Sequence, residues 1–423
     1  MSTDKVRVPN DEELKRITGR AVAEVVPHDE FVQGLRSGRR LRIKMGFDPT
    51  KPVITMGWAV GIRKLRQLQD LGHTVVVIIG DWTARIGDPS GRSETRQMLT
   101  EEEVMANSTA ILEQFFKILD RSKTEVRRQT EWFDEFSLAD IVRLSARFTV
   151  AQILERDDFS KRFTEKHPIG VHELLYPLLQ GYDSVAIESD IEFGGTDQKF
   201  NMLVGRELQR EMGLKCGAAG KGQALLLVPM LIGLDGTRKM SQSFDNFIGI
   251  DAPPHDMYGK LMSIPDTLIG DYFDLLTDVS DEEIADVRRS VEDPNENPME
   301  HKKRLAREIV AQFHSESDAS EAEAHFVRAF SKGDVSDELA TEVPSDRLPL
   351  ADGAASAESF TVKLPALIAD QGAAPSASEA RRLIKQRAVE VDGEVVTDLV
   401  ATVKIGSTLR VGKHRFLRIV EAD

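Results

Sequence analysis

The hydrophobic pattern of the first hundred residues predicts strands and a helix in alternation. Residues 41–47 alternate apolar and polar side chains and run into Asp48-Pro49-Thr50, which predicts a strand that ends in a loop. The apolar residues within 59–71 recur with a helical period, and Gly72 follows as a stop signal. Residues 74–79 are β-branched and almost wholly apolar, the pattern of a strand buried on both faces of a parallel sheet. A strand, a helix and a strand in this order predict a doubly wound α/β domain.

The pattern changes beyond about residue 251, where amphipathic helical segments predict a helical domain. Residues 333–358 are acidic, rich in Ala, Ser, Asp and Pro, and poor in apolar periodicity, so we expect a linker. The remaining tail carries 10 Lys and Arg against 8 Asp and Glu, a charge of +2, which leaves −17 for the rest of the chain. We therefore expect an α/β domain at 1–250, a helical domain at 251–332, the linker, and a small basic domain at 359–423.

Composition narrows the class of protein. A chain of 423 residues is long enough for two or three domains, and the net charge of −15 argues against indiscriminate nucleic-acid binding. The single cysteine, Cys216, excludes an intrachain disulfide framework, and with 9 scattered histidines it makes a structural zinc site improbable. The sequence has neither a run of about 18 apolar residues nor the apolar segment of a signal peptide. These features predict a cytoplasmic protein without a membrane span.

Two loops follow the predicted strands, at the edge where doubly wound sheets bind ligands. The first is Gly46-Phe47-Asp48-Pro49-Thr50 with Gly57 seven residues on, and a glycine at a helix start lets a nucleotide approach the backbone. The second, residues 80–93, holds glycines, two aspartates and two arginines, which suits a ligand with an amine and phosphates. Taken alone, each segment is also consistent with an ordinary surface loop that binds no ligand.

Three further segments carry polar chemistry. Tyr176, Gln180 and Asp183 share one helix face, and such groups are costly to bury without partners, so the face is either surface or a binding site. Residues 194–198 pair a double glycine with Asp197 and Gln198. Residues 234–243 form a loop with adjacent cations and two hydroxyls, suited to neutralising phosphates, although a basic surface loop would read the same.

Taken together and in this order, these segments resemble the bacterial tyrosyl-tRNA synthetases, which are class I aminoacyl-tRNA synthetases. The resemblance runs from about residue 30 to the end of the chain. The stretches that carry it are residues 46–50, 87–91, 155–159, 175–184 and 194–201, Lys239-Met240-Ser241, and, for an S4-type RNA-binding domain, residues 376–385 and 391–393. It implies a Rossmann-like catalytic domain with a doubly wound parallel sheet, a helical domain, and a C-terminal S4-like α+β domain.

The resemblance also implies a reaction. Tyrosine would attack the α-phosphate of ATP, accompanied by Mg²⁺, to give tyrosyl adenylate, and the acyl group would pass to tRNA(Tyr). Catalysis would consist of positioning and of electrostatic stabilisation of the phosphate. The family further implies a homodimer and no metal site in the protein itself.

The implied roles of the residues follow the two substrates. On the tyrosine side, Asp183 would accept the phenolic hydrogen bond, Tyr176, Gln180 and Asp88 would hold the ammonium, Gln198 would steer the carboxylate, and Thr83 and Asp197 would complete the pocket. On the other side, the nucleotide would be bound by Asp48, Gly57, Gly195 and Lys239. The catalytic groups would be Thr50, Arg92, Arg96, Ser241 and again Lys239.

The sequence departs from the family pattern on the nucleotide side. The His-x-Gly-His signature is replaced by Thr55-Met56-Gly57-Trp58, and the second lysine of the Lys-Met-Ser-Lys-Ser loop is Gln242. Each lost donor to developing charge typically costs about 10² to 10³ in rate, so we expect slow adenylation. Two alternatives stay open: a protein that binds tyrosine or tRNA without catalysis, and an enzyme that transfers the acyl group to a different acceptor.

The basic tail is the candidate RNA-binding region. Arg381, Arg382, Lys385 and Arg387, with Lys413 and Arg415, surround a short predicted helix and strand and are suited to phosphate contact. A solvated basic face is the alternative.

Overall fold

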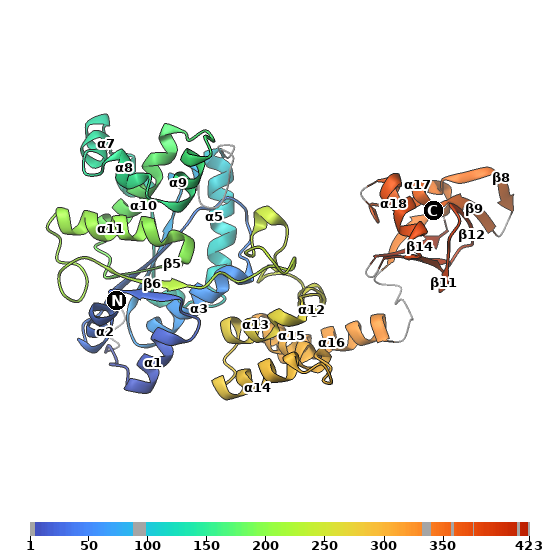
Figure 1. Cartoon of the computed structure of the whole chain (residues 1–423), viewed down its shortest axis with the longest axis horizontal. Helices are drawn as coiled ribbons and strands as arrows, with labels where there is room; N and C mark the ends of the chain where they lie inside the picture. The colour runs from blue at the N-terminus through green and yellow to red at the C-terminus, as the bar shows by residue number, and fades with distance from the viewer. Residues whose placement is uncertain are drawn as a thin grey trace. The chain divides into compact units, whose positions relative to one another are not determined.

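The chain forms two compact units, Met1–Ala319 and Ser320–Asp423, in a computed structural model that describes residues 5–87, 99–331, 340–356, 359–374, 376–412 and 415–421 (Figure 1). The second unit has a hydrophobic core of its own. None of the helices in the described part of the chain combines the length and apolar character that crossing a membrane requires.

The first unit is built on a sheet with the strand order β1-β6-β5-β2-β3-β4. Its neighbours pair in parallel except for β1, which runs antiparallel to β6. The strands are β1 (Glu24–Val26), β2 (Arg42–Phe47), β3 (Thr74–Ile79), β4 (Thr124–Arg128), β5 (Ile191–Gly195) and β6 (Ala224–Val228).

The predicted strand, helix and strand are confirmed as β2, α3 (Met56–Asp70) and β3. Residues 75–79 have no exposed surface, as expected for a central strand. Gly72 has φ +91, and its missing Cβ would lie 3.2 Å from the Lys5 carbonyl oxygen, so a side chain at this turn would be strained and crowded. The predicted Rossmann-like α/β class is therefore correct.

Helices cover both faces of this sheet. The chain moves from β2 to β3 in one direction and from β5 to β6 in the other, and right-handed crossovers then place α3 and α11 (Lys199–Glu211) on opposite faces. Helix α10 (Tyr176–Ala186) packs on α11. The strand order reverses between β5 and β2, and the crevice at their carboxyl ends is where such sheets bind ligands.

The other helices surround this framework. They are α1 (Asp11–Gly19), α2 (His28–Arg36), α4 (Thr83–Ile86), α5 (Glu101–Phe115), α6 (Thr130–Phe133), α7 (Leu138–Ser145), α8 (Val150–Ile153), α9 (Asp157–Thr164), α12 (Pro254–Met262), α13 (Ile269–Leu276), α14 (Asp281–Glu292), α15 (Met299–Phe313) and α16 (Glu316–Ser331). The predicted helical segment is present, but α12 to α15 belong to the same compact unit as the sheet, because α13 packs on α3.

The second unit is an α+β fold with two sheets, ordered β11-β10-β13-β14-β7 and β12-β9-β8. Its elements are β7 (Ala340–Pro344), β8 (Leu350–Ser356), β9 (Ser359–Lys363), α17 (Leu364–Asp370), α18 (Ala377–Lys385), β10 (Val389–Val391), β11 (Glu394–Val395), β12 (Val400–Val403), β13 (Thr408–Val411) and β14 (Arg415–Val420). The prediction of a linker over 333–358 is wrong for residues 340–356. Strand β7 pairs in parallel with β14 and β8 pairs with β9, so the domain begins earlier than its basic composition indicates.

Candidate active site

A cavity of about 270 Å³ lies at the carboxyl ends of β2, β3, β5 and β6. It brings together the predicted site residues that the structure describes. They are Asp48, Thr50, Gly57, Thr83, Tyr176, Gln180, Asp183, Gly195, Asp197, Gln198, Lys239 and Ser241. The predicted residues Asp88, Arg92 and Arg96 lie outside the described residues.

Asp183 is a buried carboxylate of the cavity, with 2% of its surface exposed. Gln129 Nε2 donates to its Oδ2 at 2.9 Å, and the indole Trp132 Nε1 donates to its Oδ1 at 3.2 Å. Burial raises the pKa of Asp183 to about 7, against the opposing pull of the Lys44 ammonium. An ionised carboxylate has roughly four acceptor positions, so one that accepts two protein hydrogen bonds can also accept a ligand hydroxyl.

A buried ion pair supports the helix that carries Asp183. Lys44 Nζ lies 2.9 Å from Glu192 Oε1, and both side chains are essentially inaccessible. The same ammonium donates to the Gln180 carbonyl oxygen at 2.9 Å and to Ser184 Oγ at 2.8 Å, so its three protons are all used. This pair ties α10 to β2 and β5 and fixes the position of Gln180 and Asp183.

Close packing of α10 on α11 fixes the same helix from its other side. A Cβ at Gly181 would lie 2.9 Å from Val204 Cγ1 and 3.0 Å from the Gly205 nitrogen. The missing side chain therefore lets the helices approach closely, which turns the Tyr176, Gln180 and Asp183 face toward the cavity.

Asp48 connects the loops after β2 and β3 with α10. Its Oδ1 accepts a hydrogen bond from Thr83 Oγ1 at 2.6 Å, and its Oδ2 accepts one from the Tyr176 hydroxyl at 2.9 Å. A Cβ at Gly80 would lie 2.2 Å from Asp48 Oδ1, so only glycine leaves room for this bond. Thr83 also donates its backbone N–H to Gln129 Oε1 at 2.9 Å. The carboxyl ends of three neighbouring strands are thus joined by hydrogen bonds.

An amide cluster forms the opposite wall. Asn201 Nδ2 donates to Gln180 Oε1 at 2.8 Å and to Gln198 Oε1 at 3.2 Å. Asn201 has no exposed surface, and the hydrogen bonds that it donates to the two carbonyl oxygens orient both glutamine side chains. A carbonyl oxygen has two acceptor positions, so Gln180 Oε1 can also accept a hydrogen bond from a ligand ammonium.

The basic loop, residues 234–243, lines part of the cavity. Asn246 holds it from beneath: its Oδ1 accepts from the Ser241 N–H at 2.9 Å, and its Nδ2 donates to Asp235 Oδ2 at 2.9 Å. Hydrogen bonds from the Arg238 and Thr237 N–H groups hold the pKa of Asp235 well below its usual range. Lys239 Nζ pairs with Asp197 Oδ2 at 2.7 Å, so a cation of the loop already reaches a predicted substrate residue.

The positions that depart from the family pattern line the same cavity. Thr55 is 1% exposed, and its Oγ1 finds no hydrogen-bond partner among the described residues. The Trp58 ring packs edge-on against Phe47 with 6.1 Å between ring centroids. Gln242 Nε2 donates to the Val53 carbonyl oxygen. An indole and two neutral polar groups thus stand where the pattern has imidazoles and an ammonium.

Sequence reasoning missed Gln129, Trp132, Asn201 and Asn246, which position the predicted residues. Gln129 directly follows β4, so a search for polar residues after every parallel strand would have found it. Strand β4 itself is half-exposed and rich in charged residues, so its hydrophobic pattern did not predict a strand before Gln129. Asn201 and Asn246 carry no local signal, because their partners are distant in the sequence.

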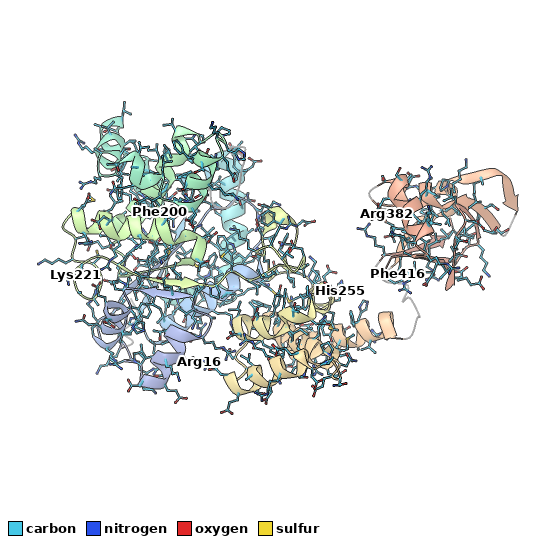
Figure 2. The ribbon with its side chains drawn as sticks, in the orientation of Figure 1. Arg16, Phe200, Lys221, His255, Arg382 and Phe416 are labelled. Atoms are coloured by element: carbon cyan, nitrogen blue, oxygen red, sulfur yellow. The ribbon has the colours of Figure 1, made fainter. Side chains whose placement is uncertain are left out.

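In the second unit, the predicted RNA-binding residues Arg381, Arg382, Lys385 and Arg387 are all exposed on or just after α18. Figure 2 marks Arg382, which pairs with Glu379 at 2.6 Å. Arg415 instead donates to the Ala373 carbonyl oxygen at 2.7 Å and so secures the chain after α17. Lys413 lies outside the described residues.

The site and fold define a class of protein. The family profile of class I tRNA synthetases (W and Y) matches residues 36–331, and that of the S4 domain matches residues 362–409. The chain therefore belongs to the class I aminoacyl-tRNA synthetases. Within this class, identities of 50% and 47% to two bacterial tyrosine–tRNA ligases over nearly the whole chain show that it belongs to the tyrosine–tRNA ligase family.

The chain is 50% identical to a tyrosine–tRNA ligase of Dehalococcoides mccartyi strain CBDB1, over 97% of this chain and 99% of the relative. It is 47% identical to that of Thermotoga maritima, over 96% and 97%. Its fold matches a solved tyrosyl-tRNA synthetase of Archaeoglobus fulgidus with a TM-score of 0.59, at 22% identity, over 74% of this chain and 98% of that one. The family expected from the motifs is confirmed.

Proposed function

We propose that this aminoacyl-tRNA synthetase activates tyrosine with ATP and transfers it to tRNA(Tyr). The observation that carries the amino-acid assignment is Asp183, a buried acceptor held by two donors at the cavity. A pocket that ends in such an acceptor favours a side chain with a terminal hydroxyl, since an apolar ring would leave the remaining acceptor positions of the buried carboxylate unfilled. Tyrosine is the amino acid with that shape and chemistry.

In the proposed first step, a carboxylate oxygen of tyrosine attacks the α-phosphorus of ATP. A bond forms between that oxygen and phosphorus, the bond to the bridging oxygen breaks, and pyrophosphate leaves with the electron pair. Tyr176, Gln180 and Asp88 hold the ammonium and Gln198 orients the carboxylate, while Thr83 and Asp197 add polar contacts. These residues act by placing the nucleophile, so no side chain has to take a proton from a carboxylate that is already ionised.

Cations and hydroxyls on the nucleotide side meet the phosphates in this proposal. Thr50, Ser241 and Lys239 line that part of the cavity, as do Gly57 and Gly195, and Arg92 and Arg96 complete the set. In the described residues, no group of three His, Cys, Asp or Glu side chains could hold a metal ion. Ammonium and hydroxyl donors suit phosphate oxygens, and Mg²⁺ arrives bound to the ATP phosphates, where it neutralises their charge.

We propose that adenylation is slow relative to enzymes with the full signatures. The changed positions 55, 58 and 242 all lie on the nucleotide side, whereas the groups around Asp183 form a complete network. The same distribution supports a second candidate, an enzyme that passes an activated tyrosine to an acceptor other than tRNA.

We propose that the second unit binds tRNA. The exposed cations of α18 (Arg381, Arg382, Lys385) and the adjacent Arg387 suit contacts with a phosphate backbone. These substrates imply a cytoplasmic protein.

We also propose a homodimer that covers an apolar face of the first unit. Leu138, Val142, Val150, Phe163 and Val171 come from α7 to α9 and the turn after them, and each is between 58% and 80% exposed. Apolar groups gathered at this density mark an interaction surface. The change Phe163→Glu should shift the protein from dimer to monomer in sedimentation velocity, and a wild-type monomer at micromolar concentration would contradict the assignment.

The test of the activity is tyrosine-dependent exchange between ATP and labelled pyrophosphate. The wild type should be compared with the variant Thr55→His/Trp58→His/Gln242→Lys. Exchange by the wild type, faster in the variant, supports a slow ligase, and charging of tRNA(Tyr) is then measured. Exchange by the variant alone means that the native protein has given up adenylation. Exchange by neither, with tyrosine still bound, refutes the ligase assignment.

A further inference from the structure

The cavity holds a second cation that the family resemblance does not point to. In the part of the chain that the structure describes, Lys51 and Lys239 are the basic residues that line it. Lys51 Nζ donates to the Gln242 carbonyl oxygen at 3.2 Å. Lys51 comes from the loop after β2, whereas Gln242 belongs to the basic loop, so the two loops meet at this point.

The two loops are joined in both directions. Gln242 Nε2 donates to the Val53 carbonyl oxygen, two residues beyond Lys51, while the Lys51 ammonium reaches back to the Gln242 backbone. The Gln242 side-chain amide is therefore engaged with the loop after β2. It fastens the basic loop to the segment that carries the lysine.

That segment is held from its other side by α5. Asn107 Nδ2 donates to the Pro49 carbonyl oxygen at 3.0 Å. Gln114 donates to the Pro52 carbonyl oxygen at 2.8 Å and accepts from the Ile54 N–H at 2.7 Å. These hydrogen bonds to the backbone on both sides of Lys51 hold its Cα beside the cavity.

The two cations differ in whether a carboxylate of the protein already pairs with them. Lys239 is paired with Asp197 at 2.7 Å. Lys51 makes no ion pair with a carboxylate among the described residues, and its one hydrogen bond leaves two N–H donors. An exposed ammonium at a cavity rim is free to turn toward a polyanion.

We propose that Lys51 contacts the β- and γ-phosphates of ATP and stabilises the departing pyrophosphate, and so supplies the charge that neutral Gln242 does not. This inference rests on the proposed activation of tyrosine. A charged donor aimed at developing negative charge accelerates a reaction by about 10² or more when no other group replaces it. Position 51 and position 242 are adjacent in space, so a lysine at either one can reach the same phosphates.

The experiment compares Lys51→Ala, Lys51→Ala/Gln242→Lys and Gln242→Lys with the wild type. Lys221→Ala is the matched control, an exposed lysine of the same unit that is marked in Figure 2 and lies outside the cavity lining. Pyrophosphate exchange gives kcat and the KM for ATP and for tyrosine, and calorimetry gives the Kd of ATP without tyrosine and of tyrosine without ATP.

Lys51→Ala should lower kcat/KM for ATP by about tenfold to a hundredfold and leave the Kd of tyrosine within about twofold. Adding Gln242→Lys should recover most of that loss and should help the Lys51→Ala protein more than it helps the wild type. The assignment is overturned if Lys51→Ala behaves like Lys221→Ala, or if the two substitutions act independently.

Failure of the proposed activity is distinguishable from failure of this inference. If the wild type exchanges no pyrophosphate, the Kd of ATP still decides the role of Lys51, which requires weaker ATP binding by Lys51→Ala than by Lys221→Ala. Wild-type protein that binds tyrosine but not ATP overturns the assignment of Lys51.

Discussion

The change Asp183→Ala tests how the cavity distinguishes tyrosine from phenylalanine. In the folded protein Gln129 and Trp132 each donate one hydrogen bond to Asp183, at 2.9 and 3.2 Å, so the carboxylate is held in one orientation. Replacing it with a methyl group removes the acceptor for the phenolic hydroxyl and leaves the backbone of α10 in place. The substitution therefore acts on the recognition of one hydroxyl.

The expected magnitude follows from the hydrogen bonds at stake. A hydrogen bond to a charged acceptor contributes about 1.5 to 3 kcal/mol, and a buried hydroxyl left without a partner costs about 1 to 3 kcal/mol. Their sum predicts a fall of about 10² to 10⁴ in kcat/KM for tyrosine. Phenylalanine makes no such bond and should change by less than about tenfold. A preference of about 10⁴ to 10⁵, typical of sites built around a substrate hydroxyl, should shrink to about 10² or less.

The assay is pyrophosphate exchange with each amino acid at saturating ATP, supported by calorimetric binding of tyrosine and phenylalanine. Trp132→Phe is a useful companion, because it removes one donor to Asp183 and retains the carboxylate, so it should reduce the preference far less. A thermal melt of each variant separates recognition from folding. If Asp183→Ala keeps the wild-type ratio of the two amino acids, the phenol does not bind at Asp183 and the orientation proposed for tyrosine is wrong.

Three further predictions follow from charges seen in the structure. Because burial raises the pKa of Asp183 to about 7 and the phenol favours the ionised form, tyrosine affinity measured by calorimetry should rise about tenfold from pH 6 to pH 8; a flat profile would mean that tyrosine binds the neutral and the ionised carboxyl equally well. Glu192→Gln leaves Lys44 buried without its charged partner and should lower the free energy of unfolding in urea by about 3 kcal/mol. The control Glu125→Gln, which breaks a partly exposed ion pair, should change that free energy by less than about 1 kcal/mol. The variant Arg381→Ala/Arg382→Ala/Lys385→Ala should weaken tRNA binding in filter assays and flatten its salt dependence while pyrophosphate exchange stays at the wild-type rate; tRNA affinity equal to that of the wild type would remove α18 from the interface.

The sequence predicted those parts of the molecule that local patterns determine. Strand β3 is an unbroken apolar run because both of its faces are covered, and the face formed by Tyr176, Gln180 and Asp183 follows from helical spacing alone. The strand at 340–344 escaped prediction because it pairs with β14, far along the chain, and local sequence does not identify such a partner. The strand at 350–356 pairs with the adjacent β9, but its small and polar residues gave no alternation to detect.

The same distinction applies within the site. Motif order indicated which residues gather at the cavity, but not that Asp48, expected beside the nucleotide, accepts hydrogen bonds from Tyr176 and Thr83. Nor could it indicate that Lys239 reaches Asp197 or that Lys51 meets Gln242. These contacts join loops that follow different strands, and their geometry is set by the sheet.

The hydrogen-bond network around Asp183 is separate from the positions proposed to meet ATP. Asp183 is held in place by Gln129, by Trp132 and, through α10, by the Lys44–Glu192 pair. In the described residues, none of these groups makes a hydrogen bond to Thr55, Trp58 or Gln242. A change at position 51, 55, 58 or 242 should therefore alter the rate of adenylation without altering the ratio of kcat/KM for tyrosine and phenylalanine. Conversely, Asp183→Ala should leave the Kd of ATP unchanged. A variant on the nucleotide side that shifted the amino-acid ratio would show that the two networks are coupled.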